Sequence, residues 1–133
     1  TPFQWDREIN GGFSTGKPWL KVNPNYVDIN AEQETQDKHS LFAYYQQLIA
    51  LRRHSKISDI LVYGEFSPLV SPENVIAFKR TDDGNSVNIY CNFSGEEKAL
   101  TIKAKDIYLH NSPIVEDAQG GLILQPYQAI IFA

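Results

Sequence analysis

At 133 residues, the chain is long enough for one domain with a hydrophobic core but too short for a complete (β/α)₈ barrel, which needs roughly 200 residues. Hydrophobic residues make up 42 % and charged residues 21 %, as in globular proteins, and the formal net charge of −4 disfavours nucleic acid as a partner. No run approaches the roughly 18 apolar residues that a membrane span needs, so no membrane partner is expected. The single cysteine, Cys91, excludes an internal disulfide framework and favours a reducing compartment.

The first part of the chain, from Thr1 to about Gln36, shows no sustained period of 2 or 3.6 residues. It contains three prolines and three glycines, which are typical of turns and loops. A loop of this length usually has a function of its own. The sequence therefore predicts a long irregular segment with aromatic side chains that need a packing partner outside the chain: Phe3, Trp5, Phe13, Trp19 and Tyr26.

An amphipathic helix is predicted over Ser40 to His54, where apolar residues recur at the spacing of one helical face. Ser40 is the expected N-cap, and the basic residues at the carboxyl end suit the helix dipole. Phe42 and Ile49 widen the apolar stripe, so the helix is expected to need partners on more than one side. The stripe itself contains Leu41, Tyr44, Tyr45, Leu48 and Leu51.

The remainder of the chain, from about Ile60 to Ala133, alternates short apolar runs with turn residues every 8 to 12 positions or so, which is typical of an antiparallel sandwich. The run Asp82 to Asn85 is a hairpin signal, and it lacks the spaced ligands of a calcium loop. The predicted strands are Ile60 to Phe66, Val75 to Arg80, Val87 to Phe93, Lys98 to Ile102, Ile107 to His110, Gly121 to Leu124 and Gln128 to Phe132.

Within one predicted strand, Val87, Ile89, Cys91 and Phe93 alternate with more polar residues. This period of 2 places the four side chains on one buried face. Cys91 is accordingly interpreted as a small hydrophobe in the core, although a reactive nucleophile is the alternative.

The opening segment resembles the α-glucosidase branch of the α-amylase superfamily (glycoside hydrolase family 13), which includes oligo-1,6-glucosidases, dextran glucosidases and trehalose-6-phosphate hydrolases. Weaker motifs, such as Asn92-Phe93-Ser94, extend the resemblance over nearly the whole chain. Phe3 stands where the family commonly has methionine, and Gly11 where alanine is common. The resemblance is carried by Thr1-Pro2-x-Gln4-Trp5-Asp6, Gly12-Phe13-Ser14, Pro18-Trp19-Leu20 and Val22-Asn23-Pro24-Asn25-Tyr26.

This resemblance implies a mainly β fold: a Greek-key β-sandwich preceded by a long irregular segment and one amphipathic helix left over from the barrel. Residues 1–57 would be the tail of the catalytic barrel and residues 58–133 the C-terminal sandwich domain. The parent would be a cytoplasmic, retaining α-glucosidase without a cofactor. The barrel and an α-glucoside oligosaccharide would be the partners.

No catalytic residue is expected within this chain, because none of the family motifs that carry the two catalytic carboxylates is present. Gln4 and Trp5 are the candidates for a substrate loop in the parent, since an amide can bond sugar hydroxyls and an indole can stack on a sugar ring. The alternative is that Trp5 and Trp19 only anchor the loop. No metal site is expected, and the acids of the opening segment are interpreted as solvated or capping: Asp6, Glu8, Asp28, Glu32, Glu34 and Asp37.

Two function classes compete for the chain taken alone. The favoured one is a non-catalytic C-terminal domain of an α-glucosidase, and the alternative is a stand-alone carbohydrate-binding module. Such a module needs a row of exposed aromatic side chains on the sandwich. The available ones are Tyr63, Phe66, Tyr90, Tyr108 and Tyr127. Without the barrel, exposed apolar surface also predicts a homodimer.

Overall fold

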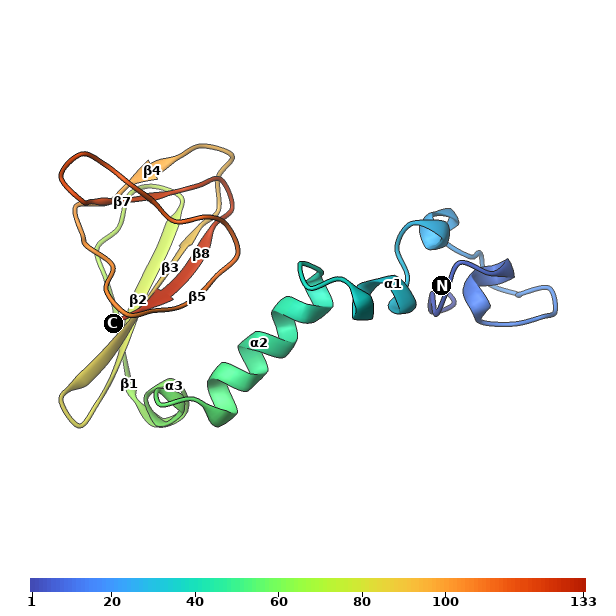
Figure 1. Ribbon diagram of the computed structural model, residues 1–133, viewed down its shortest axis with the longest axis horizontal. Coiled ribbons are helices and arrows are strands. Elements are labelled where there is room, and N and C mark those ends of the chain that lie inside the picture. The colour runs from blue at the N-terminus through green and yellow to red at the C-terminus, as the bar shows by residue number, and fades with distance from the viewer. The chain divides into compact units, whose positions relative to one another are not determined.

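The computed structural model describes all 133 residues, which form two compact units, Thr1–Gln47 and Leu48–Ala133. Figure 1 shows the elements of each unit. The boundary predicted between residues 57 and 58 concerns the domains of a parent enzyme, and it stays a prediction.

The first unit contains more helix than the irregular segment that the sequence predicts. Short turns of 3₁₀ helix, η1 and η2, occupy Ile9–Gly12 and Pro24–Val27, and a helix of six residues, α1, spans Ala31–Gln36. The Asn30 side chain begins α1 by accepting a hydrogen bond from the Gln33 backbone N–H at 3.0 Å. Such one-turn elements depend on local caps, so hydrophobic periodicity does not reveal them.

The long helix α2 spans Leu41–His54, which confirms the predicted helix and its cap. Ser40 Oγ accepts a hydrogen bond from the Ala43 N–H at 3.1 Å. Glu34 Oε2 accepts one from the Phe42 N–H at 3.3 Å. None of the side chains of α2 is buried, and four of its apolar side chains, Leu41, Phe42, Tyr45 and Ile49, are between 43 % and 67 % exposed.

The second unit is an antiparallel sandwich of two sheets, which confirms the predicted fold class. The five-stranded sheet has the order β1-β2-β3-β8-β5, so the last strand of the chain lies between β3 and β5. The three-stranded sheet has the order β4-β7-β6. The strands are β1 (Glu65–Pro68), β2 (Val75–Asp82), β3 (Asn85–Asn92), β4 (Lys98–Ala99), β5 (Ile107–His110), β6 (Val115–Glu116), β7 (Leu122–Leu124) and β8 (Ala129–Phe132).

The tight turn between β2 and β3 confirms the hairpin prediction. Asp82 pairs with Asn85, which leaves Asp83 and Gly84 as a two-residue turn. Their φ angles of +44° and +76° are those of a type I′ turn, whose twist matches the twist of the flanking strands.

The predicted strand over Ile60 to Phe66 is wrong, because Ser58–Tyr63 form a helix, α3, and only Glu65–Pro68 form a strand. The run of β-branched and apolar residues in this segment favours a strand locally. Tertiary contacts decide otherwise, since the Arg80 guanidinium on β2 donates hydrogen bonds to the carbonyls of Ile60 at 3.2 Å and Gly64 at 2.7 Å. A positive charge at the C-terminal end of a helix satisfies free carbonyls and suits the helix dipole.

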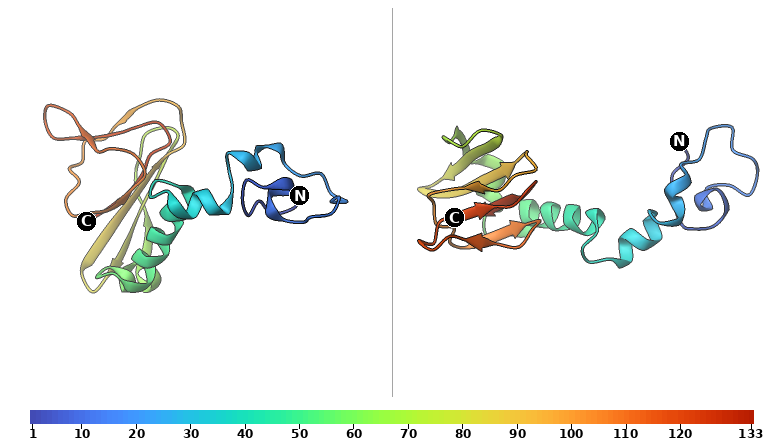
Figure 2. Two further views of the ribbon diagram at one scale, coloured as in Figure 1. Left: turned by 45° about the vertical axis from the view of Figure 1, so that its right-hand side comes forward. Right: turned by 90° about the horizontal axis from the view of Figure 1, so that it is seen from above.

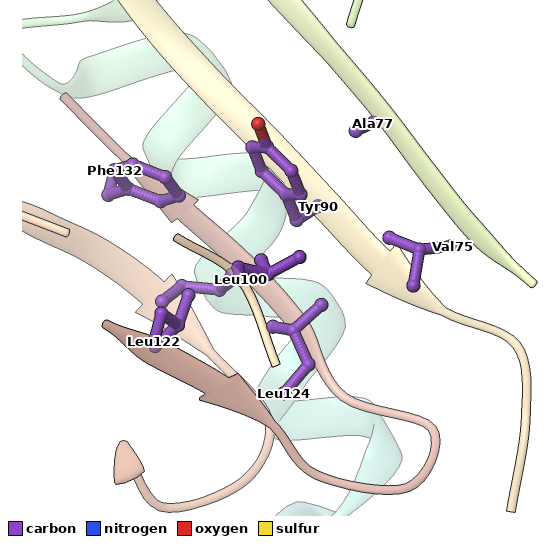
Figure 3. Close-up of a cluster of buried hydrophobic side chains, with 8 residues drawn as sticks. Val75, Ala77, Tyr90, Leu100, Leu122, Leu124 and Phe132 are labelled. Atoms are coloured by element: carbon purple, nitrogen blue, oxygen red, sulfur yellow. The ribbon is translucent and has the colours of Figure 1, made fainter. Parts of the chain in front are cut away.

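The main core lies between the two sheets (Figure 3). Tyr90 of β3 and Phe132 of β8 stack with their ring centroids 5.8 Å apart. Side chains from the other sheet, Leu122 and Leu124, are almost completely buried against them. The cluster consists of Val75, Ala77, Tyr90, Leu100, Leu122, Leu124, Ile130 and Phe132.

A second core lies on the opposite face of the five-stranded sheet, where α3 packs (Figure 2). Ile57 and Leu61 contact Val87 and Ile89, and Cys91 packs against their edge. Strand β3 therefore buries both of its faces. This is why Tyr90, which the alternation assigns to the opposite face from Ile89, is also buried.

The predicted burial of Phe93 is wrong, because the Phe93 side chain is 64 % exposed. Phe93 follows the end of β3 in the same alternation as Ile89 and Cys91. Alternation assigns a residue to a face but does not say how far the covering element extends, and α3 does not extend over Phe93.

Replacement of Ile89 by alanine is expected to lower the free energy of unfolding by about 2 to 5 kcal/mol, because Ile89 is 8 % exposed and lies in the second core. The matched change Phe93→Ala removes an exposed side chain, and we expect it to cost less than about 0.5 kcal/mol. Chemical denaturation of both variants measures the difference. Equal losses would contradict the assignment of the two positions.

Candidate functional site

The candidate site lies in the first unit, where the backbone of Gln4 and Trp5 is held by hydrogen bonds from two sides. The Ala31 N–H donates to the Gln4 carbonyl and the Glu32 N–H to the Trp5 carbonyl, both at 2.9 Å. The Trp5 N–H donates to the Gly11 carbonyl at 2.8 Å. These bonds join the opening segment to the start of α1.

The side chains of Gln4 and Trp5 differ in which of their groups can still contact a ligand. The Gln4 amide nitrogen donates one N–H to the Ile29 carbonyl, so its second N–H and the amide oxygen are left for a ligand. The Trp5 indole is 55 % exposed and lies 4.5 Å from the Phe3 ring, with 58° between the ring planes. The Trp5 ring is thus accessible to a ligand, whereas part of the Gln4 amide is used in a hydrogen bond within the protein.

Both residues line a hollow of about 630 Å³ within the first unit. Phe42 lies on its wall, together with Glu34, whose carboxylate caps the start of α2. Most of the lining is apolar. The remaining residues include Pro2, Phe3, Ile29 and Thr35.

A sharp turn beside these residues depends on glycine. Asn10, Gly11 and Gly12 all have positive φ angles, of 59°, 67° and 66°. A Cβ atom on Gly12 would overlap the carboxylate of Asp6, and one on Gly11 would lie 3.4 Å from the Gln4 backbone. Gly11, which stands where the family commonly has alanine, therefore occupies a position that suits glycine.

Three of the acids in the opening segment accept backbone hydrogen bonds. Asp6 accepts from the Glu8 N–H and Asp37 from the His39 N–H, both at 2.8 Å, and Glu34 accepts from the Phe42 N–H. These contacts agree with the capping role expected for them. No three His, Cys, Asp or Glu side chains in the chain are grouped so that they could hold a metal ion.

Two ionisable groups of the sandwich have shifted pKa values. Burial raises the pKa of the Cys91 thiol and that of the Tyr90 hydroxyl. A raised pKa lowers the thiolate fraction at neutral pH, and the thiolate is the nucleophilic form. This supports the interpretation of Cys91 as a small hydrophobe instead of a nucleophile, and its partly buried side chain lies at the edge of the second core. No helix is long and apolar enough to cross a membrane.

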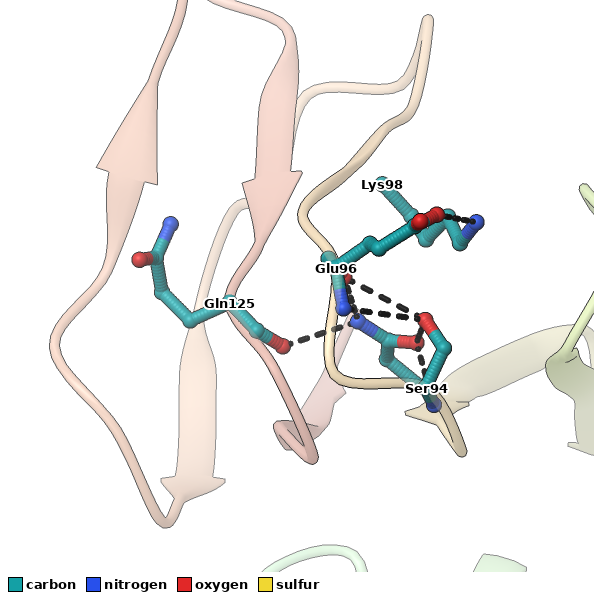
Figure 4. A network of polar contacts seen from close by, with 5 residues as sticks. Ser94, Glu96, Lys98 and Gln125 are labelled. Carbon is teal, nitrogen blue, oxygen red and sulfur yellow. Dashed lines mark hydrogen bonds and ion pairs between the residues drawn. The ribbon is translucent and has the colours of Figure 1, made fainter.

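The motif Asn92-Phe93-Ser94 has a structural role at the end of β3 (Figure 4). The buried Asn92 amide donates to the carbonyls of Glu96 at 2.7 Å and Gln125 at 3.0 Å. Its oxygen accepts from both the N–H and the hydroxyl of Ser94. Although the motif matches the acceptor pattern for N-glycosylation, all of the bonding capacity of the amide is directed inward.

A second buried amide, Gln128, performs a similar role in the loops. It is 0 % exposed, accepts from the Gln125 N–H at 2.8 Å and donates to the Ser112 carbonyl at 2.8 Å. Sequence reasoning assigned no role to Gln128 or to Arg80. In the sequence, each appears only as a polar residue within a largely apolar strand pattern. This pattern does not reveal a structural role, because the hydrogen-bond partners lie 16 to 20 residues away.

Comparison with known proteins agrees with the opening motifs. The family described as "Alpha amylase, catalytic domain" matches residues 1–64. The oligo-1,6-glucosidase of Bacillus cereus is 34 % identical over 99 % of this chain and 24 % of its own length. The chain belongs to the α-amylase superfamily. The trehalose-6-phosphate hydrolase of Bacillus subtilis is 35 % identical over the same shares of the two chains.

The fold agrees with this membership in the α-amylase superfamily. The crystal structure of a trehalulose synthase from Pseudomonas mesoacidophila MX-45 matches with a TM-score of 0.86 and 37 % identity. The match covers 99 % of this chain and 24 % of that one. The chain thus spans about a quarter of the length of the relatives it matches, and it aligns with the C-terminal region of α-glucosidases.

Replacement of Gly12 by alanine is expected to destabilise the first unit by about 1 to 2 kcal/mol, the usual cost of a left-handed conformation for an L-residue, and to displace Asp6. Gly16→Ala is the matched control, because the nearest atom to an added Cβ, Ser14 Oγ, is 3.7 Å away. Both tryptophans of the chain lie in this unit, so their fluorescence during urea unfolding reports the difference. Equal curves for the two variants would contradict the expectation.

Proposed function

We propose that this chain is the non-catalytic C-terminal portion of a retaining α-glucosidase that hydrolyses α-glucosidic bonds in oligosaccharides. The observation that carries the proposal is the alignment of 99 % of the chain with about a quarter of an oligo-1,6-glucosidase. Hydrolysis with retention needs two carboxyl groups about 5 to 5.5 Å apart on a rigid scaffold. Since Asp6, Glu34 and Asp37 cap backbone N–H groups, we assign the catalytic pair to the barrel of the parent.

In this proposal residues 1–57 complete the barrel, and residues 58–133 form a sandwich domain that stabilises it. The match of the catalytic-domain family to residues 1–64 supports the assignment of the first part. The exposed apolar stripe of α2 supports it as well, because a helix with this much free apolar surface needs a neighbour. The barrel is therefore the proposed partner, and the unpaired Cys91 supports a cytoplasmic location.

Within the parent, we assign Gln4 and Trp5 to the loop that borders the sugar site. The free face of the Trp5 indole supports a stacking role toward a glucose ring. The free oxygen of the Gln4 amide could accept a hydrogen bond from a sugar hydroxyl, while its nitrogen holds the loop through Ile29. The substrate is an α-glucoside oligosaccharide, as the names of the relatives suggest.

The second candidate function is a carbohydrate-binding module, and one observation favours it. Tyr63, Phe66 and Tyr127 are 79 %, 57 % and 67 % exposed. Against it, Tyr90 is buried in the main core and Tyr108 is partly buried, so fewer aromatic side chains are available than a binding row needs.

The isolated chain is expected to be inert toward glucosides, because the parent's catalytic pair is assigned to the barrel. Incubation with a chromogenic α-glucoside should release no more product than buffer, and calorimetric titration with isomaltose should give no saturable heat. The polypeptide that joins this chain to its barrel should hydrolyse isomaltose with retention of configuration, seen by NMR. Activity of the isolated chain that is lost on mutation of one of its acids would refute the proposal, and saturable binding would favour the module.

We further propose that the isolated chain forms a homodimer. In the first unit, Phe3, Trp5, Phe13 and Trp19 are between 52 % and 91 % exposed. Apolar patches larger than a few hundred Å² are rarely left in water. Packing of the opening segment of one copy on the opening segment or on α2 of the other would cover them.

Light scattering at micromolar concentration is expected to give about twice the chain mass of 15.1 kDa. The matched control is the chain without residues 1–36, which should scatter as a monomer. A monomeric mass for the complete chain, with its opening segment resistant to proteolysis, would contradict the dimer.

A further inference from the structure

Two dipeptides of the chain carry the groups for a spontaneous rearrangement of the backbone, Asn10-Gly11 and Asp83-Gly84. In each, the backbone nitrogen of the glycine can attack the side-chain carbonyl carbon of the residue before it. Glycine favours this attack because it has no Cβ to hinder the approach. The attack needs a glycine N–H that is free to lose its proton and a side chain that is free to rotate onto the nitrogen.

At the first dipeptide, hydrogen bonds hold both of the groups that would react. The Asn10 amide nitrogen donates to the carbonyls of Ser14 at 2.8 Å and Gly16 at 3.0 Å. Gly11 is buried, and its N–H donates to the Glu8 carbonyl at 2.8 Å. The attack can therefore begin only after these three hydrogen bonds have opened.

At the second dipeptide, both groups are free. Asp83 and Gly84 form the exposed turn between β2 and β3. The Asp83 carboxylate accepts no hydrogen bond and forms no ion pair, and the Gly84 N–H has no acceptor. The Asn85 amide donates only to the backbone carbonyl of Asp83, at 3.3 Å. A Cβ atom on Gly84 would meet no other atom within 4 Å, so there is room for a ring to form at the turn.

The backbone conformation does not distinguish the two dipeptides. Asn10 has a φ angle of 59° and Asp83 one of 44°, so both residues are in the left-handed region. Burial and hydrogen bonding are what differ between them.

We propose that Asp83-Gly84 is the site of spontaneous isoaspartate formation in the folded chain, and that the fold protects Asn10-Gly11. In the first step, the Gly84 nitrogen bonds to Asp83 Cγ, a Cγ–O bond breaks and water leaves, which gives a five-membered cyclic imide. In the second step, water adds to the original main-chain carbonyl of Asp83 and the bond from this carbonyl to nitrogen breaks. The main chain then runs through Cγ, and no atom is gained or lost overall.

The modification would act on the strand pairing that the sandwich depends on. The product adds a methylene to the main chain of a two-residue turn, whose type I′ geometry requires two ordinary residues with positive φ. The pairing of Asp82 with Asn85 at the end of the hairpin is therefore expected to loosen. Strand β3, which begins at this turn, supplies side chains to both cores. The reaction needs neither a barrel nor a sugar, so it goes beyond the proposed function.

The first experiment uses the unmodified 133-residue chain, incubated at neutral pH and physiological temperature for several weeks. Peptide mapping with electron-transfer fragmentation distinguishes isoaspartate from aspartate at each position. We expect isoaspartate to accumulate at position 83 and not at Asp59, which is also exposed but is followed by the β-branched Ile60. Isoaspartate at position 83 that does not exceed the level at Asp59 would overturn the proposal.

The second experiment tests the role of the fold with the same dipeptide at both sites. Asp83→Asn creates a second Asn-Gly pair, and asparagine suits a type I′ turn. In the folded variant, the amide at position 83 is expected to be lost at least about ten times faster than that of Asn10, because Asn10 must wait for its hydrogen bonds to open. In the same variant unfolded in denaturant, the two positions are expected to react at similar rates.

Mass spectrometry follows the change from amide to acid at the two positions. Equal rates in the folded variant would overturn the proposed protection of Asn10. A difference that persists in denaturant would overturn it as well, since local sequence and not the fold would then be the cause. The measurement on the unmodified chain stands by itself if Asp83→Asn prevents folding.

Discussion

The five-stranded sheet has to bury two faces, and the architecture of the second unit follows from this constraint. Strand β3 supplies Tyr90 to the core between the sheets and Val87 and Ile89 to the core beneath α3. Sheets with two covered faces need apolar side chains at successive positions, so alternation along their strands is weak. The position of α3 thus determines how much of the outer face is removed from water.

Arg80 holds α3 in this position. Its guanidinium donates to the carbonyls of Ile60, Val62 and Gly64, and Arg52 of α2 donates to the Leu61 carbonyl at 3.0 Å. Two arginines therefore satisfy four carbonyls at the end of a helix of six residues. A helix this short has little stability of its own, so its formation depends on these bonds and on the apolar contacts of Ile57 and Leu61.

The first unit is organised in a different way. Backbone hydrogen bonds from α1 and from the turn at Gly11 hold Gln4 and Trp5, while the aromatic rings of the unit remain largely exposed. The polar bonds fix the course of the chain, and the apolar rings are left available for contact with another surface. This combination suits a segment that completes a larger domain, as membership in the α-amylase superfamily suggests.

The sequence by itself determined the family, the sandwich class, the helix α2 with its Ser40 cap and the β2–β3 hairpin. These features depend on local signals: an ordered set of motifs, an amphipathic period, a capping serine and an Asp-Gly turn. It also singled out Gln4 and Trp5 but not the bond between Gln4 and Ile29, because that partner is 25 residues away. Only the tertiary structure decided that residues 58–63 are helical and that Phe93 is exposed. Both depend on Arg80 and on the extent of α3, which are long-range contacts that local propensity and alternation do not encode.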